Sequence, residues 1–278
     1  PAAVAALFAV MTKVGLYAVL RVSSLWFGEE AGAMAGFASD WLLVAGLGTL
    51  VLAALGVLAA ARLRVLIAYL VLVSAATLFI AFSLGQVGTI GAGLYYLAHS
   101  TFVTAALFLV ADLIRRRRGL ASDRKEIIAP MPGKTGPSLL FLVAAISVAG
   151  LPPLSGFLAK AALLSAIPAA NTAWVWSVVL LSSLMVIVGL SRAGVRLFWR
   201  VPAAVEAGDA VALPPPLRKA PSRPLETAAA VLLILYGIGM TVAAAPMMRY
   251  TEAAAAQLLD SASYVGELRA TPSRSRAP

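Results

Sequence analysis

The amino-acid sequence predicts an all-α membrane protein, a bundle of about seven transmembrane helices of which one is discontinuous. The chain of 278 residues is 61% hydrophobic and 12% charged, with a mean hydropathy of +0.93. A soluble domain carries roughly a quarter charged residues. Apolar runs of about twenty residues or more, long enough to cross a hydrocarbon core of about 30 Å, recur along the chain. Such unbroken runs indicate helices, because the strands of a membrane barrel alternate between polar and apolar residues.

The expected spans follow these apolar runs. They lie at residues 2–27, 40–61, 64–84, 88–114, 138–167, 173–199 and 226–248. Residues 1–249 are therefore expected to form a transmembrane domain, and residues 250–278 an extracytoplasmic tail, first amphipathic and then disordered. The chain starts at Pro1 without an initiator methionine, and its first apolar run contains a lysine, unlike a signal peptide. It is expected to be a piece of a longer chain.

The charges of the loops predict the orientation. The second, fourth and sixth loops are basic, with the run Arg115 to Arg118 in the fourth, whereas the other loops are neutral or acidic. By the positive-inside rule, the chain begins in the cytoplasm and ends outside. The same rule explains the net charge of +10 without a nucleic-acid partner. With no cysteine, the chain has no disulfide and no thiolate metal site.

Lys13 stands in the middle of the first span, roughly 16 Å or more from either interface. A lysine stem reaches only part of that distance. A lysine at this depth costs a few kcal/mol on insertion scales and normally faces a polar cavity or a partner. Lys13 is therefore a candidate protonatable site.

Lys160 follows a predicted break in the fifth span. Gly150, Pro152, Pro153 and Gly156 precede it, and paired prolines cannot continue a regular helix. Broken helices at membrane depth line cavities and mark ion sites in transporters. The alternative is a plain proline kink with Lys160 extending to the surface.

His99 lies near the middle of the fourth span, where a neutral imidazole could pass a proton between its two nitrogens. Its alternative is a buried histidine satisfied by a hydroxyl or carbonyl. Ser100 and Thr104 beside it, and Tyr69 in the third span, are secondary candidates. Packing or a hydrogen bond between helices explains Tyr69 and Ser74, and an ion pair with Arg115 and Arg116 explains Asp112. No carboxylate lies deep in any span, and no nucleophile, metal cluster or nucleotide loop indicates a cofactor or an enzyme.

These residues also carry a family resemblance. Residues 12–21 (TKVGLYAVLR) resemble the eighth-helix signature of the antiporter-like subunits shared by Mrp-type monovalent cation/proton antiporters and respiratory complex I. Residues 150–160 (GLPPLSGFLAK) are similar to the broken twelfth helix of that family, with its lysine. Residues 95–109 resemble its histidine-bearing helix. The lysine of the first motif, in place of histidine, is most similar to the D-type branch of the Mrp (Pha) family.

The resemblance implies a fold of about fourteen helices with two inverted five-helix repeats, of which this chain holds the C-terminal half. It implies that Lys13, His99 and Lys160 form a proton relay, and that the acidic partner of Lys13 lies upstream of Pro1. Thr104 stands where many relatives have a second lysine. Ala61 and Arg62 replace an acidic–basic pair common in the family.

The sequence therefore predicts a proton-translocating subunit of a multisubunit Na⁺ or K⁺/H⁺ antiporter in the bacterial inner membrane, working with other subunits. Two alternatives remain. One is a membrane subunit of complex I, a NADH-quinone oxidoreductase, or of a membrane-bound hydrogenase. The other is a scaffold subunit that packs against partners without transporting.

Overall fold

A computed structural model describes residues 2–118, 123–124, 133–200 and 224–270. Their backbone is helical, without a strand in the described ranges; Arg62 and Arg124 form an isolated bridge. In chain order, the helical segments are α1 (Ala2–Trp26), the 3₁₀ helix η1 (Glu29–Met34), α2 (Ser39–Ala59), α3 (Leu63–Ser83), α4 (Val87–Arg117), α5 (Thr135–Ala149), α6 (Ser155–Ser165), α7 (Ala169–Gly194), the π-helical turn η3 (Val195–Trp199), α9 (Pro224–Val242), α10 (Ala244–Leu259) and α11 (Ser261–Ala270).

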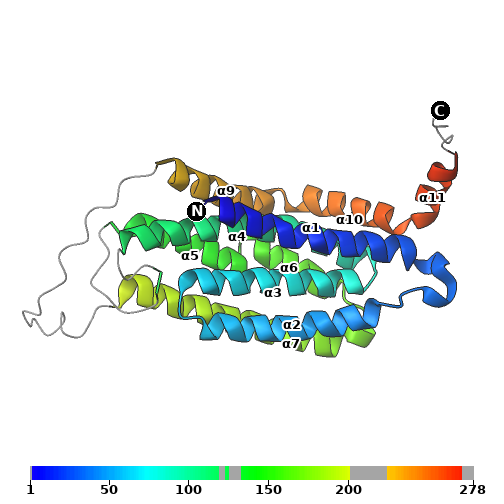
Figure 1. Ribbon diagram of the computed structural model, residues 1–278, viewed down its shortest axis with the longest axis horizontal. Coiled ribbons are helices and arrows are strands. Elements are labelled where there is room, and N and C mark those ends of the chain that lie inside the picture. The colour runs from blue at the N-terminus through cyan, green and yellow to red at the C-terminus, as the bar shows by residue number, and fades with distance from the viewer. Residues whose placement is uncertain (1, 119–122, 125–132, 201–223, 271–278) are drawn as a thin grey trace, which may run out of the picture.

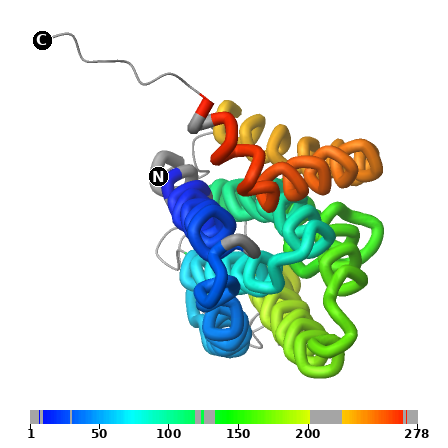
Figure 2. The backbone as a smooth tube through the Cα atoms, turned by 90° about the vertical axis from the view of Figure 1, so that its right-hand side faces the viewer, coloured from blue at the N-terminus to red at the C-terminus, as the bar shows by residue number. Residues whose placement is uncertain are grey.

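The helices run side by side along the long axis of the molecule (Figure 1). In that view α2 and α7 form one edge, while α9 and α10 lie end to end along the other. Helix α4 occupies the middle of the bundle (Figure 2) and contacts α1, α3, α5, α6, α9 and α10. A residue on α4 can therefore face almost any other part of the bundle, and the position of His99 on this helix is central.

Several described helices are long and apolar enough to cross a membrane. They comprise the segments Ala31–Ala59, Leu63–Ser83, Val87–Arg117, Ala169–Trp199 and Pro224–Val242. Helices α5 and α6 are apolar but shorter, and they follow one another around a break. The predicted all-α membrane bundle is confirmed. The division into a transmembrane domain and an outer tail stays a prediction, and the last residues of that tail, 271–278, lie outside the described residues.

The predicted discontinuity lies between α5 and α6. Helix α5 ends at Ala149, and the φ of 78° at Gly150, its C-cap, is in the left-handed region that glycine adopts without strain. The peptide bond between Pro152 and Pro153 is cis, and α6 begins at Ser155. The expected span 138–167 therefore consists of two half-helices.

A second break, which the sequence analysis missed, interrupts the last expected span. Residues 226–248 belong to α9 and the start of α10, which are separated at Ala243. Pro246 explains the break, because its nitrogen cannot donate to the Val242 carbonyl and its ring crowds that carbonyl. Helix α10 then continues from Ala244 to Leu259 and packs along α4.

Candidate functional site

Lys13 is buried inside the bundle, with 3% of its surface exposed. Its ammonium donates a hydrogen bond of 2.7 Å to the hydroxyl of Ser74 on α3, and that hydroxyl donates to the Val71 carbonyl. A groove of about 420 Å³ opens beside the lysine between α1 and α4. It is lined by Val10, Lys13, Val14, Tyr17, Leu94, Leu97 and Thr101. The acceptor on Lys13 is a neutral hydroxyl, and Ser74, expected to serve packing, is its partner.

Lys160 is held by the break itself. Its Nζ donates to the Ala149 carbonyl at 2.9 Å and to the Ser183 hydroxyl of α7 at 3.2 Å. In an unbroken helix the Ala149 carbonyl would accept from residue 153, but Pro153 has no N–H to donate. The two prolines therefore free a carbonyl at the negative end of α5, where a cation is favoured.

Two glycines let the half-helices approach these groups. A Cβ atom on Gly150 would lie 2.8 Å from Cδ and 3.1 Å from Nζ of Lys160. On Gly156 it would overlap the Ser147 carbonyl oxygen and lie 2.8 Å from Nε2 of His99. The glycines of the break thus make room for the lysine and the histidine as well as for the turn.

His99 is buried on α4, facing α6. Its Nδ1 lies 2.8 Å from the hydroxyl of Ser155, the first residue of α6, and the Tyr96 ring lies 5.9 Å from the imidazole. Lys160 follows five residues after Ser155 on the same helix and is close enough to His99 for their charges to interact. The structure therefore brings His99 and Lys160 together around α6, and places Lys13 on the other side of α4.

In the described residues, the secondary candidates are not the hydrogen-bond partners of the two lysines. The hydroxyl of Ser100 donates to the Leu97 carbonyl and that of Thr104 to the Ser100 carbonyl, so both bond within α4. Tyr69 packs its ring against Gly56 of α2 and lines a groove of about 620 Å³ with Arg62 and Arg64.

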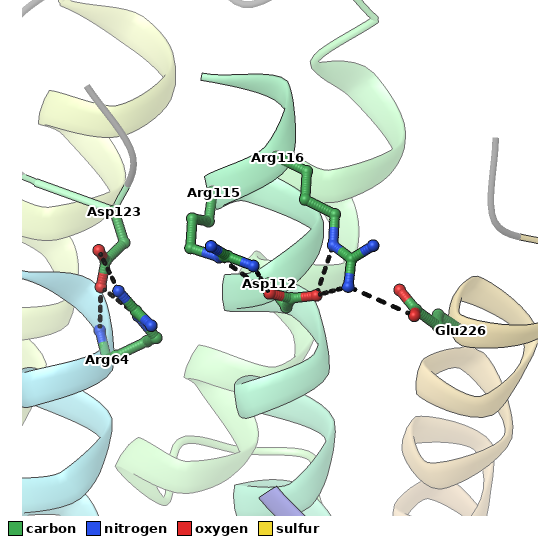
Figure 3. Close-up of polar contacts among 6 residues, drawn as sticks. All are labelled: Arg64, Asp112, Arg115, Arg116, Asp123 and Glu226. Atoms are coloured by element: carbon green, nitrogen blue, oxygen red, sulfur yellow. Dashed lines mark hydrogen bonds and ion pairs between the residues drawn. The ribbon is translucent and has the colours of Figure 1, made fainter. Parts of the chain in front are cut away.

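Carboxylates are found at the end of the bundle where α4 ends (Figure 3). Asp112 pairs with Arg115 at 2.8 Å and Arg116 at 2.5 Å, as the sequence predicts, and Arg116 also reaches Glu226 of α9 at 3.5 Å. Asp123 accepts two hydrogen bonds from the Arg64 guanidinium. Within the described ranges, no carboxylate lies within ion-pair distance of Lys13 or Lys160, and no group of acidic or histidine side chains could hold a metal.

The hydroxyl partners are the part of the site that the sequence analysis missed. Ser74, Ser155 and Ser183 each bond one of the three buried ionisable residues. In the sequence, each of them is recognisable only as a serine within an apolar span. Ser147 and Ser182 also lie in apolar spans. Only the arrangement of the helices tells these serines apart.

Fold and site together define a polytopic helical membrane protein with ionisable groups buried around a broken helix. Residues 1–186 match the family described as NADH:quinone oxidoreductase/Mrp antiporter, TM, and the chain belongs to this family. The match contains Lys13, His99, Lys160 and the whole α5–α6 break.

Curated relatives extend the likeness over nearly the whole chain. The D subunit of a probable K(+)/H(+) antiporter from Rhizobium meliloti is 34% identical over 92% of this chain and 50% of its own length. The D subunit of a Na(+)/H(+) antiporter from Bacillus subtilis is 31% identical over 95% of this chain and 51% of its own. The chain thus spans about half the length of these relatives.

A solved structure shows the same fold. A chain of the Mrp complex from Dietzia sp. DQ12-45-1b superimposes with a TM-score of 0.77 at 22% sequence identity, covering 94% of this chain and 54% of that chain. The structural match again extends over half of the larger chain. This chain therefore has the fold of about half of that larger chain.

Proposed function

We propose that this chain is the C-terminal half of a proton-translocating subunit of a multisubunit Na⁺ or K⁺/H⁺ antiporter. The observation that carries the proposal is that Lys13, His99 and Lys160 are buried on three helices and bonded to neutral hydroxyl and carbonyl groups. The names of the curated relatives, which are D subunits of cation/proton antiporters, support the same assignment.

The neutral partners suit a relay. When a lysine bonded to a buried carboxylate loses its proton, it leaves that carboxylate unpaired at a large cost. Within the part of the chain that the structure describes, Lys13 and Lys160 bond to a hydroxyl or a carbonyl instead, so neither leaves an opposite charge behind in this half of the subunit when it gives up a proton. Lys13, His99 and Lys160 then act as successive protonatable sites, and their proton movement is coupled to Na⁺ or K⁺ movement in the whole complex.

The complex would include other antiporter subunits in the bacterial inner membrane. The acidic partner of Lys13 would lie in the preceding half of the full-length subunit. The start of this chain faces the cytoplasm and its end the outside, an orientation that the basic run Arg115 to Arg118 at the end of α4 supports.

The test is antiport in everted membrane vesicles from cells that express the full-length subunit with its partners. Lys13→Ala and Lys160→Ala are expected to abolish cation-dependent proton movement at normal subunit levels. Lys134→Ala is the matched control, because Lys134 lies before α5 and donates to the Phe198 carbonyl at the end of the bundle. Intact antiport in both buried-lysine variants would overturn the proposal.

A second candidate is a membrane subunit of a complex I-type or hydrogenase complex, in which redox chemistry elsewhere drives the same relay. The family description names NADH:quinone oxidoreductase together with the Mrp antiporter. This shared description is the reason to retain the second candidate. Gene neighbours decide between the two: small antiporter subunits on one side, quinone-reductase or hydrogenase subunits on the other. If the chain is a scaffold subunit that does not transport, Lys13→Ala and Lys160→Ala will both leave antiport intact.

A further inference from the structure

The groove of about 620 Å³ that Tyr69 lines runs along α3 from the end of the bundle where α4 terminates, and the proposed function does not use it. It has a charged mouth, where Arg62, Arg64 and Asp123 lie. Below the mouth, the lining side chains are apolar apart from the Tyr69 hydroxyl. A groove that combines a charged mouth with an apolar floor fits an amphiphilic ligand better than a soluble ion.

The charge at the mouth is positive. Asp123 is already paired with Arg64, whose guanidinium donates to it at 2.9 and 3.1 Å and whose backbone N–H donates at 3.1 Å (Figure 3). Arg62 is exposed and takes part in none of the ion pairs found in the described ranges. A backbone bridge holds Arg62 beside Arg124. The mouth therefore has one carboxylate among three arginines.

The floor of the groove follows one face of α3. Its side chains are spaced three or four residues apart, which places them in a row along the helix. They are Val65, Ala68, Tyr69 and Leu72, and Phe108 of α4 completes the lining. Val65 and Leu72, at the two ends of the row, are each 43% exposed. The row is therefore open to a molecule that lies beside the bundle.

The length of the groove distinguishes a lipid chain from a helix. From Arg62 to Leu72, ten residues of helix rise about 15 Å, which is half of a hydrocarbon core of about 30 Å. The groove is therefore about as long as one leaflet is thick. A neighbouring transmembrane helix would follow α3 over its whole length to Ser83, whereas the residues that line the groove on α3 stop at Leu72.

We propose that this groove binds an anionic phospholipid of the leaflet at this end, which is the cytoplasmic leaflet in the proposed orientation. The phosphate lies at the mouth, against Arg62 and the exposed side of the Arg64 guanidinium, because arginine donates paired hydrogen bonds to phosphate oxygens. One acyl chain lies along the apolar floor. Basic pockets between transmembrane helices at the cytoplasmic side recognise anionic headgroups by the same chemistry. The site goes beyond the proposed function, because it uses none of the buried ionisable residues.

The experiment uses the complex that contains the full-length subunit, purified into nanodiscs that carry a lipid with a photoreactive diazirine on one acyl chain. That lipid is phosphatidylglycerol in one preparation and phosphatidylcholine with the same chains in the other. Mass spectrometry of the digested protein measures the labelling of residues 65–72. Phosphatidylglycerol is expected to label this segment about fivefold more strongly, the factor that one arginine near the headgroups contributes to the binding of an anionic lipid.

Three variants and a reference position make the test specific. Arg62→Gln is expected to bring the labelling by the two lipids close to equal. Arg200→Gln is the matched control and should keep the preference, because Arg200 is also exposed, follows η3 at the same end of the bundle and does not line the groove. Ala68→Trp fills the floor and should lower the labelling by both lipids. Leu139 of α5, which is 59% exposed and outside the groove, should be labelled without preference.

The outcomes separate this site from the proposed function. Equal labelling of residues 65–72 by the two lipids would overturn the proposal, and so would a preference that Arg200→Gln lowers as much as Arg62→Gln does. Labelling at Leu139 without labelling of residues 65–72 would mean that protein covers the groove, which also overturns it. Lys13→Ala is expected to lose antiport and keep the lipid preference. If Lys13→Ala and Lys160→Ala leave antiport intact while the preference remains, the proposed function is wrong and the lipid site stands.

Discussion

The interior of the bundle and the end where α4 terminates handle cationic side chains in opposite ways. At the end, arginines meet carboxylates: Asp112 binds two of them, and Asp123 binds Arg64. In the interior, Lys13 and Lys160 meet hydroxyls and a backbone carbonyl. The difference is one of chemistry as well as depth, because a carboxylate fixes the charge of its partner and a hydroxyl does not.

This contrast assigns different tasks to the two regions. The end pairs join α4 to α9, and they join the start of α3 to Asp123, which comes after α4 in the chain. They hold their charges in fixed geometry. The interior groups can exchange a proton while their hydrogen-bond partners remain neutral. The two regions should therefore respond differently to substitution, with transport sensitive to the interior and only stability sensitive to the end.

The largest effect is expected at Gly156, where an added Cβ would lie closer to another atom than at any other described glycine. Gly156→Ala places a methyl group against the Ser147 carbonyl oxygen, and backbone atoms must move to admit it. We expect a loss of about 3 kcal/mol of stability, at the upper end for overpacking, seen as a lower unfolding temperature of the purified complex. Gly48→Ala is the control, because a Cβ there meets nothing within 4 Å. Equal unfolding temperatures for the two variants would contradict the packing described.

A smaller effect is expected from removing the hydroxyl partner of Lys13. Ser74→Ala leaves the buried ammonium without its described acceptor, at a cost of about 1–3 kcal/mol. Ser183→Ala should cost less, because Lys160 keeps the Ala149 carbonyl at 2.9 Å. The two variants are compared by thermal unfolding and by antiport rate. If Ser183→Ala proves the more damaging, the carbonyl freed by Pro153 is not what holds Lys160.

The end cluster should give a still smaller change, confined to stability. Asp112→Asn removes two ion pairs whose arginines are 38% and 27% exposed, and partly exposed pairs contribute about 1 kcal/mol or less. Antiport per assembled subunit should stay unchanged. Glu226→Gln, which removes one pair of 3.5 Å, should cost only a few tenths of a kcal/mol. A loss of transport in Asp112→Asn at normal stability would place this end in the relay and break the contrast.

The sequence predicted what depends on local chemistry. Paired prolines forbid a continuous helix wherever they occur, so the break before Lys160 could be located without coordinates. The deep positions of Lys13 and His99 follow from counting residues within apolar runs. Pro246 is the same kind of local indication for the break at Ala243. The expected span 226–248 nevertheless treats this segment as one continuous helix.

The partners of the ionisable residues could not be predicted in this way. Ser74 lies 61 residues from Lys13 in the chain, and periodicity says which residues share a helix face, not which face meets which helix. In spans that are apolar on every side, the polar–apolar pattern that marks an inward face in soluble helices is weak. Ser74 was therefore expected to serve packing, although it binds Lys13.

The smallest effect is expected from acid at Asp123, outside the membrane-spanning helices. Burial alone would raise the pKa of this carboxyl, but hydrogen bonds from the Arg64 guanidinium and backbone N–H outweigh it and lower the pKa to about 2. An unfolded aspartate has a pKa of about 3.9. The pair therefore contributes its full stability above about pH 4 and loses it as the pH falls toward 2. Because 46% of the Arg64 side chain is exposed, solvent screens this contribution and keeps it modest.

The difference in unfolding temperature between the native protein and Asp123→Asn should be constant from pH 8 to 5 and shrink below about pH 4. A difference that stays constant from pH 8 down to pH 2 would mean that the carboxyl titrates like an unpaired group, with the same pKa folded and unfolded, and that the end of the bundle is no more fixed than its interior.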